Sequence, residues 1–498
     1  MIRTRICLYL LLLTPLAVYW QTIFHEYGLR DDYSYLREAR EEPGKLVKFT
    51  ASHGRPLYGA LLETSYFVAS NVSGLPWLRL ISVGMLTLLG LALWRQLYQS
   101  GWTEVEAAAI GLGIVLLPAA QVTASWALGW PYALTLLLAL AGFSAIETEL
   151  ERGGLKRVVA LIGGCMIYML AGLIYQSDAL FALVPIAAVL IVRTGREPMK
   201  DHWWAAIHLV TLLIGLGLSY LLVQGLFNND IFQESARMKL ETNPFTKFAW
   251  FLWQPLPNAL ALYALRDDFN TGAVIFWLAA AAVATLIGYG YKFDAARGDP
   301  LLRKKWILCL TALPLLAHSV SLVAAERSTG YRVLFTLSSL VVVMVVFAIR
   351  SLRTSGLIAQ KKPYQYYAVF LVIGAIAALS AHHNSFTLIA QPQGHEWEMV
   401  RNAVMRQDFK KPLNVYLVRA RLEDRSTERV FRDEFGSISS DSDWTPKEMF
   451  KAAVHERFGD KPPKSVAYNL TTGAELPADE KAYDLVIDMR RLRQKRPE

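Results

Sequence analysis

The first polar segment of the chain contains two adjacent carboxylates, followed by a histidine and an arginine. Asp31 and Asp32 come soon after a long apolar stretch, and His53 and Arg55 lie near the end of the same segment. Neighbouring carboxylates can take a proton from an acceptor hydroxyl or hold a divalent cation such as Mg²⁺ or Mn²⁺. They can equally cap a short helix over residues 33–42. The residue types leave both roles open for Asp31 and Asp32.

Arginines in two separate segments are candidate ligands for a phosphate group. Arg55 belongs to the first polar segment, whereas Arg327 and Arg332 share a short polar connection with Glu326 and Tyr331. Guanidinium groups bind phosphate oxygens and neutralise charge on a leaving group. The structural alternatives are that Arg55 anchors the chain at a membrane interface and that Glu326 pairs with a neighbouring arginine. We predict a phosphate site formed by Arg55, Arg327 and Arg332.

Aromatic and amide side chains that could hold a sugar occur at other polar positions. Aromatic faces and amide hydrogen bonds commonly hold sugars, although tryptophans also anchor membrane proteins at the interface. The predicted substrate ligands are His53, Gln121, Trp126, Trp130, Tyr175, Gln176, Glu326 and Tyr331.

Three further polar groups are weaker candidates. Asp178 falls at a tight turn, where a buried carboxylate would be a functional candidate. Asp267-Asp268 is a second acidic pair that also precedes a helix, so it ranks behind Asp31-Asp32. His318 is expected to be a satisfied residue of the helical bundle.

Long apolar runs must position these groups, because 54% of the residues are hydrophobic. Runs long enough to cross a bilayer predict about eleven transmembrane helices. They cover residues 6–24, 76–98, 105–122, 131–148, 158–174, 178–193, 203–226, 271–290, 306–323, 332–350 and 364–382.

The net charge of +9 is mostly an orientation signal. Successive connections between the spans are alternately rich and poor in Lys and Arg. Because cytosolic connections collect these residues, the alternation places the N-terminus, with Arg3 and Arg5, in the cytosol. An odd number of spans then places the C-terminus outside. The basic residues form no single stripe with interleaved aromatics, so nucleic-acid binding is disfavoured.

Two domains are expected. Residues 1–382 form the membrane domain, with a first outer loop over 25–75, an interfacial helix over 57–73 within it, and a large outer loop over 227–270 whose aromatic stretch lies at the interface. Residues 383–498 form a small soluble α/β domain with strands at 413–418, 465–470 and 483–488. In that domain Thr445 is expected to cap a helix through Phe458, with Glu448 completing a capping box. The three cysteines all fall in apolar spans, so the soluble domain has no disulfide.

The order of these elements resembles the multispanning GT-C glycosyltransferases. The resemblance rests on a first span, an outer loop with an Asp pair, the Gly-Arg-Pro-Leu-Tyr helix at residues 54–58, and Leu75-Pro-Trp-Leu-Arg79 opening the second span. It covers roughly residues 1–150. Tyr175-Gln176 and Glu326-Arg327 further resemble the bacterial serotype-converting glucosyltransferases, a group related to the aminoarabinose transferases and protein O-mannosyltransferases.

The resemblance implies transfer of a sugar from a polyprenyl-phosphate donor to a glycan, lipid or protein acceptor at the outer face of a bacterial inner membrane. It places the catalytic acid in the first outer loop, at Asp31 or Asp32, and leaves a divalent cation optional. Two rival functions remain open at this stage: a transporter or flippase of lipid-linked saccharides, and a ligase of whole glycans. A transporter would show internal repeats with interrupted helices, and the chain has no such repeat.

Overall fold

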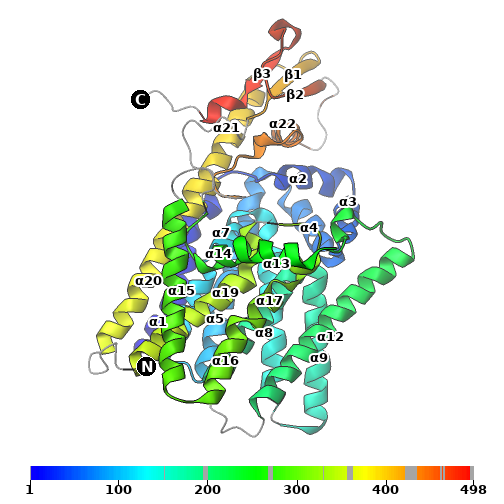
Figure 1. Ribbon diagram of the computed structural model, residues 1–498. Coiled ribbons are helices and arrows are strands. Elements are labelled where there is room, and N and C mark those ends of the chain that lie inside the picture. The colour runs from blue at the N-terminus through cyan, green and yellow to red at the C-terminus, as the bar shows by residue number, and fades with distance from the viewer. Residues whose placement is uncertain are drawn as a thin grey trace.

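A bundle of long apolar helices forms the centre of the computed structural model (Figure 1). The structure describes residues 2–493 except 151, 194–199, 267–272, 329, 356–362, 421–433, 460–462 and 464–465. In this part of the chain, eight helices are long and apolar enough to cross a membrane, which makes the chain a multi-pass membrane protein. They are α1 (Ile2–Phe24), α5 (Leu75–Gln99), α8 (Trp130–Leu150), α9 (Gly154–Ile174), α12 (Asp201–Asn228), α15 (Ala273–Ala296), α19 (Phe335–Thr354) and α20 (Pro363–His383).

Two of the predicted spans are broken and a third is a shorter apolar helix, so the expectation of about eleven regular spans is not confirmed. The span at 105–122 is a pair, α6 (Glu104–Val115) and α7 (Pro118–Ser125), bent by 55° where Pro118 removes a backbone donor. The span at 178–193 is the shorter helix Gln176–Val192, in which the 3₁₀ turn η3 (Leu180–Ala182) joins α10 (Gln176–Ala179) to α11 (Leu183–Val192). The span at 306–323 is broken into α16 (Pro300–Leu310), α17 (Ala312–Ala317) and α18 (Ser319–Val323).

Helix α19 is the central element of the bundle. The most apolar stretch of this helix is 89% buried, whereas the corresponding stretches of α15 and α20 are 22% buried. The exposed residues of α15 and α20 are large and apolar, so these helices face lipid. The chain starts at the end of the bundle that lies away from the C-terminal sheet (Figure 1).

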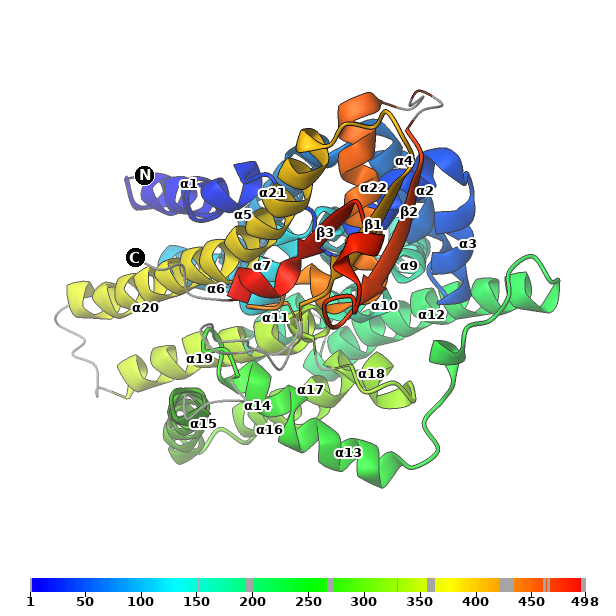
Figure 2. The same cartoon turned by 90° about the horizontal axis from the view of Figure 1, so that it is seen from above.

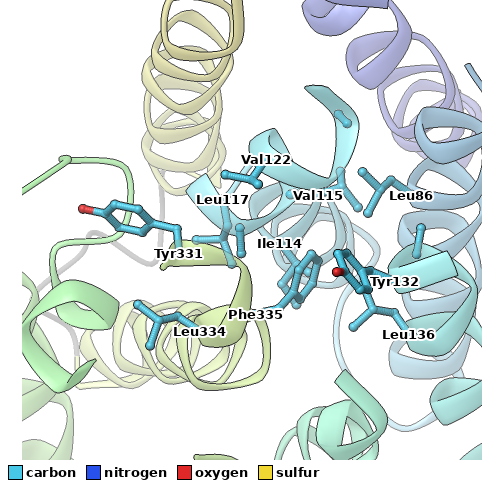
Figure 3. Close-up of a cluster of buried hydrophobic side chains, with 14 of the residues drawn as sticks. Leu86, Ile114, Val115, Leu117, Val122, Tyr132, Leu136, Tyr331, Leu334 and Phe335 are labelled. Carbon is cyan, nitrogen blue, oxygen red and sulfur yellow. The ribbon is translucent and has the colours of Figure 1, made fainter. Parts of the chain in front are cut away.

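A buried apolar cluster joins α19 to the bent pair beneath the outer surface. Figure 3 shows Leu117 and Val122 of the bent pair near Tyr331, which belongs to the 3₁₀ turn η5 (Tyr331–Leu334) before α19. Phe335, the first residue of α19, packs edge-on against the ring of Phe181. This packing fixes the turn that carries Arg332.

Short helices form a layer over the end of the bundle that carries the C-terminal sheet (Figure 1). The first outer loop contains α2 (Asp31–Glu41), α3 (Lys45–Ser52) and α4 (Pro56–Ala69), and the large loop contains α13 (Pro244–Trp253) and α14 (Pro255–Leu260). Helix α2 ends before Pro43, and Gly44 has φ 82°, a left-handed value that glycine adopts without strain. Pro56 opens α4, where its missing N–H costs nothing.

The chain leaves the membrane on one continuous helical path. Helix α20 runs through a π-helical segment, η6 (Asn384–Ala390), into α21 (Gln391–Arg406), as Figure 1 shows. A three-stranded parallel sheet follows, in the order β2-β1-β3, with β1 (Leu413–Val418) in the centre. Its partners are β2 (Tyr468–Gly473) and β3 (Leu485–Asp488), and α22 (Thr445–Phe458) packs beside them. The predicted small α/β unit therefore forms.

One detail of the predicted helix start at Thr445 is wrong. Trp444 is the N-cap, and Thr445 is already the first helical residue. Glu448 does not close a capping box, because its carboxylate binds Arg37 of α2 at 2.8 Å and Lys451 at 2.8 Å. The Glu448 side chain therefore connects the C-terminal domain to α2 and does not cap the start of α22. Figure 2 shows the resulting arrangement, with α22 lying over α2 and α4.

Candidate active site

The two adjacent aspartates at the start of α2 have different surroundings. Asp32 is fully buried, while Asp31 is partly buried. The Asp32 carboxylate accepts hydrogen bonds from the Leu29 backbone N–H at 2.8 Å and from the Tyr66 hydroxyl. The Asp31 carboxylate accepts none from the described residues. Asp32 therefore fixes the turn, and Asp31 is the acid that a substrate can reach.

A buried arginine holds the polypeptide that leads into this turn. Arg79 of α5 donates to the carbonyl oxygens of Ile23 at 3.2 Å, His25 at 2.7 Å and Tyr27 at 3.0 Å, at the end of α1. Its guanidinium carbon lies 4.0 Å from the centre of the Tyr27 ring. Carbonyls at a helix end have no intrahelical donors, so a cation there satisfies and orients them. Arg79 thus sets the path of residues 25–30.

Burial raises the pKa of both carboxyl groups. For Asp32 the pKa rises to about 7, because desolvation outweighs the Tyr66 and Leu29 hydrogen bonds and the charge of Arg79. For Asp31, burial raises the pKa while the charges of Arg332, Arg30 and Arg237 oppose the rise. An acid whose pKa is moved toward neutral pH is a better proton acceptor when it is ionised.

A cavity of about 410 Å³ is lined by Arg332 and Arg237, whose charges act on Asp31, whereas Asp31 itself is not one of its lining residues. One part of its wall is cationic and contains Arg55, Arg237 and Arg332. Another part is formed by α12 and α18, with Leu216, Tyr220, Val223, Val320 and Val323. The cavity therefore combines a concentrated positive charge with apolar helix faces, a combination suited to an anionic head group on a hydrocarbon chain.

Arg55 is held by two residues of the turn after α9. Its Nε donates to Gln176 Oε1 at 3.3 Å, and its guanidinium carbon lies 4.4 Å from the centre of the Tyr175 ring. The Gln176 amide nitrogen donates to the Gly54 carbonyl at 2.6 Å, which ties this turn to the first outer loop. The predicted residues Arg55, Tyr175 and Gln176 thus come together at the cavity wall, as does His53.

Arg332 contacts both the membrane domain and the C-terminal domain. Its guanidinium carbon lies 5.3 Å from the centre of the Trp126 ring, and its Nε lies 3.8 Å from Glu434 Oε1. Glu434 begins the segment 434–441, whose Phe435 meets Tyr331 edge-on. Glu434, a residue of the C-terminal domain, therefore places a negative charge close to Arg332.

Residues 235–241, which we call the strap, border the cavity on its outer side. The Ser235 N–H donates to Ser52 O at 2.9 Å. At the other end the strap pairs with residues 323–325, through Glu241 N–H to Val323 O at 2.9 Å and Ala325 N–H to Lys239 O at 2.8 Å. Arg237 and Met238 lie between these anchors and line the cavity.

Several predicted substrate ligands have structural roles instead. Gln121 is fully buried, donates to Leu116 O at 2.8 Å and accepts from Asn384 at 3.1 Å. The Tyr331 hydroxyl accepts the Arg266 backbone N–H at 2.7 Å. Trp130 donates to Ser65 at 3.2 Å. None of the three lines the cavity.

The polar connection before α19 is split between two positions. Glu326 lines the cavity and lies 3.9 Å from Arg237, while Arg332 follows at the inner wall. Arg327 is exposed and outside the cavity wall, so the structure does not bring it to the other two predicted phosphate ligands. Arg237 takes the third position. The sequence analysis did not assign Arg237 to the phosphate site, because an arginine in a long loop has no local sequence pattern that indicates its neighbours in the fold.

A larger cavity, of about 520 Å³, lies between α2, the end of α4 and α22. Its cations are Arg37, Arg40 and Lys451, and Arg37 and Lys451 both bind Glu448. Because the charge of these two is already balanced by a carboxylate, this cavity is a weaker phosphate site than the one lined by Arg55, Arg237 and Arg332. The Asp267-Asp268 pair lies outside the described residues.

A divalent cation would have limited ligands at the aspartate pair. Both carboxylate oxygens of Asp32 are engaged, which leaves Asp31 as the only member of the pair with free oxygens. No group of three or more His, Cys, Asp or Glu side chains comes together within the part of the chain that the structure describes.

The chain is similar to solved structures of an archaeal oligosaccharyltransferase from Archaeoglobus fulgidus. One is tethered to an acceptor peptide with the NVT sequon (13% identity, TM-score 0.44, covering 91% of this chain and 63% of that one). Another is in complex with an inhibitory peptide and a dolichol-phosphate (12%, 0.42, 91% and 63%). A third holds zinc and sulfate (11%, 0.42, 90% and 61%).

The chain spans less than two thirds of the length of the structures it matches. At this identity and TM-score, no activity or residue role passes from those proteins to this chain. No protein-family model and no curated protein matches it.

Proposed function

We propose that this protein transfers a sugar from a polyprenyl-phosphate donor to an acceptor hydroxyl at the outer face of the membrane. The observation that supports the proposal is the cavity whose wall combines apolar helix faces with three arginines, two of which, Arg237 and Arg332, also act by their charge on Asp31, an acid with free oxygens outside the wall. A phosphate would meet Arg55, Arg237 and Arg332, and the polyprenyl chain would follow α12 and α18 toward the lipid. The N-terminus and the connections rich in Lys and Arg would face the cytosol.

Asp31 would act as the general base. The acceptor oxygen attacks the anomeric carbon and forms the new C–O bond, while its proton passes to the Asp31 carboxylate. The bond between the anomeric carbon and the phosphate oxygen breaks, and its electron pair stays on the phosphate. A single displacement of this kind inverts the configuration of the anomeric carbon. The donor would leave as a polyprenyl phosphate, whose added charge the arginines neutralise.

The roles of the two aspartates would differ. Asp31 would touch the reacting hydroxyl, and Asp32, with Tyr66, would hold the start of α2 so that Asp31 faces Arg332. A divalent cation, if bound, would be held through Asp31 and would add to the neutralisation of the phosphate. The C-terminal domain would cover the site and contribute Glu434 to its rim.

The test supplies the purified protein with radiolabelled polyprenyl-phosphate sugars and extracts of the cell envelope as acceptor. We expect Asp31→Asn to lower transfer by about 10² to 10⁴-fold, the contribution of a general base. Asp230→Asn is the matched control, because Asp230 is an exposed acid on the same side with φ 55°, a conformation that asparagine tolerates. Transfer by a folded Asp31→Asn protein at the wild-type rate would rule out the proposal.

The same assay separates a transferase from a flippase. A transferase consumes the donor and releases polyprenyl phosphate in step with the appearance of labelled product. A flippase would move the donor across the bilayer and leave its sugar–phosphate bond intact. Release of polyprenyl phosphate that depends on Asp31 is the result that the site geometry predicts.

A further inference from the structure

We propose that the cavity of about 520 Å³ between α2, the end of α4 and α22 binds the acceptor, and that this acceptor is a neutral oligosaccharide. The inference rests on the proposed function, because it names the substrate class of the same transfer. The cavity holds sugar units of the acceptor that are distant from the reacting hydroxyl. Its volume lies within the range of about 300–1,000 Å³ that ligand sites have.

One face of α2 forms a wall of this cavity along most of the helix. The residues of this face, spaced three and four positions apart as on one side of a helix, are Tyr33, Leu36, Arg37, Arg40 and Glu41. Asp31 is the first residue of the same helix. At about 1.5 Å per residue, Glu41 lies roughly 15 Å along the axis from Asp31. An acceptor that fills the cavity and also reaches Asp31 is therefore extended and longer than a single sugar.

The opposite wall belongs to the C-terminal domain. Its residues in α22 and at the start of β2 are Lys451, Ala452, Val454, His455 and Tyr468. Two contacts hold the walls together: Arg37 binds Glu448 at 2.8 Å, and Arg40 donates to His455 Nε2 at 3.2 Å. The cavity thus forms where the two domains meet, as Figure 2 shows for α22 over α2 and α4. The C-terminal domain therefore takes part in acceptor recognition.

Aromatic rings from three elements line the cavity. Tyr33 is buried against Trp397, with 5.7 Å between the ring centres, and Tyr468 meets Phe450 edge-on at 5.3 Å. Phe67, near the end of α4, is 59% exposed, so its ring is available to a ligand. A sugar carries apolar C–H groups between its hydroxyls, and aromatic faces bind such groups.

The charges of the wall are balanced by contacts within the protein. Arg37 binds Glu41 at 3.2 Å, Glu42 at 2.6 Å and Glu448 at 2.8 Å, and Lys451 binds Glu448 at 2.8 Å. Paired charges attract an anionic ligand weakly, whereas their N–H groups and carboxylate oxygens stay in fixed positions. Fixed donors and acceptors beside aromatic rings suit the hydroxyls of a neutral sugar better than a phosphate or an acidic polymer.

The experiment separates the cell-envelope acceptor into an oligosaccharide fraction, a delipidated protein fraction and a phospholipid fraction. Transfer of labelled sugar from the polyprenyl-phosphate donor to each fraction is then measured with the full-length protein. We expect the label in the oligosaccharide fraction, with a rate that saturates as this acceptor is added. Label in the protein fraction would identify a peptide acceptor instead.

Two substitutions in the wall test the cavity itself. Ala452→Trp places a large side chain from α22 into the cavity and should raise the acceptor KM about tenfold by steric exclusion. Phe67→Ala removes an exposed aromatic face and should raise the acceptor KM about threefold to tenfold. The donor KM and the affinity for polyprenyl phosphate should keep their wild-type values in both variants, because a misfolded protein would lose these as well.

Val68 provides the matched controls. It follows Phe67 in α4, is 77% exposed and does not line the cavity. Val68→Trp and Val68→Ala should therefore leave the acceptor KM unchanged. Phe67→Ala carries the test alone if the Ala452→Trp protein does not fold, since the Phe67 ring contributes little to the core.

Two negative results are distinguishable. If the wild-type protein labels none of the three fractions, the proposed function fails. If the label enters only the protein or the phospholipid fraction, or if folded cavity variants keep the wild-type acceptor KM, the oligosaccharide site is overturned. In that case the transfer proposed for Asp31 stands.

Discussion

Asp31 and Asp32 differ in what they contact, although they are adjacent and identical. Consecutive residues at a helix start point in directions about 100° apart, so their side chains can have different neighbours. Asp32 bonds to Tyr66 and to the turn, whereas the Asp31 carboxylate lies within the field of Arg332, Arg30 and Arg237. At the scale of single residues, the site depends on this division.

The pH dependence of transfer should report the contact between Asp31 and Arg332. Arg332 lowers the pKa of Asp31, so Arg332→Gln should raise it and move the acidic limb of kcat/KM to higher pH. Arg327→Gln is the control, since Arg327 is exposed and outside the cavity wall. An acidic limb that stays in place in a folded Arg332→Gln protein would contradict this contact.

Asp32 should make the stability of the protein depend on pH. Its pKa of about 7 in the folded protein exceeds the value of about 3.9 in an unfolded chain. Between about pH 3.9 and 7 the Asp32 carboxyl is protonated in the folded protein and ionised in the unfolded chain. The contribution of Asp32 to the free energy of unfolding is therefore highest below about pH 4 and declines as pH rises toward 7. Asp32→Asn should remove this decline in thermal unfolding scans, and Asp230→Asn should leave it unchanged.

Residue types alone predict part of this site. They predict an acid in the first outer loop together with Arg55, Tyr175 and Gln176, because polar groups that interrupt apolar runs are conspicuous. They do not separate Asp31 from Asp32, since the difference comes from the long-range bond to Tyr66. They also place Gln121 and Tyr331 in the site, although these side chains bond to backbone and bundle residues far away in the chain.

At the scale of elements, a single lysine fixes the loop beside the cavity. Lys247 of α13 is 1% exposed, and its ammonium group donates to the carbonyl oxygens of Ala324 at 2.7 Å and Glu326 at 2.7 Å. We expect Lys247→Met to cost about 2 kcal/mol of stability and to raise the donor KM, because these carbonyls lose a charged donor. Thermal unfolding and transfer kinetics measure both effects.

Lys239→Met is the control for this change, since the Lys239 side chain is exposed and has no partner among the described residues. Equal effects of the two substitutions would show that loss of charge, and not loss of the loop anchor, is responsible.

A buried glutamate of α21 holds the segment 434–441 over the site. Glu396 accepts the backbone N–H groups of Ser439 at 2.7 Å and Ser440 at 2.9 Å. Ser439 in turn accepts the Arg30 backbone N–H at 2.8 Å, next to Asp31. We expect Glu396→Gln to destabilise the protein by about 1–3 kcal/mol, because an amide supplies one acceptor where a carboxylate supplies two.

Transfer should fall in the same variant, because the rim of the site is loosened. Glu398→Gln, on the exposed face of α21, is the matched control and should behave as the wild type. Full activity of a Glu396→Gln protein that unfolds at a lower temperature would separate the segment from catalysis.

Apolar run length predicted the long helices well and the broken ones poorly. Hydropathy detects that a segment is apolar, and it does not detect where a backbone hydrogen bond is lost. Pro118 follows the break in its run directly and Pro314 follows the break at Thr311 by three residues, whereas no proline marks the break at His318. The strand predicted at 413–418 has the bounds of β1, whereas the strands predicted at 465–470 and 483–488 differ by a few residues from β2 and β3, because the ends of those strands are set by pairing with β1.

At the scale of the whole molecule, the orientation in the membrane can be measured directly. In a background with Cys7, Cys165 and Cys309 replaced by serine, Lys410→Cys should react with a membrane-impermeant maleimide on intact cells. Lys410 is 86% exposed in the C-terminal domain. Lys156→Cys, exposed at the other end of the bundle, should react only after the membrane is opened. The reverse pattern would place the site in the cytosol.

The first and last spanning helices are neighbours, and this has a consequence for the synthesis of the protein. Thr22 of α1 donates to Ser385 of η6 at 3.2 Å across 363 positions of sequence. A ribosome adds roughly 5–20 residues per second, so α1 waits about 20–70 seconds for this partner. During that time Asp31 lacks the segment 434–441 that borders it. On the proposed function, a nascent chain would therefore be inactive until its last quarter has been made.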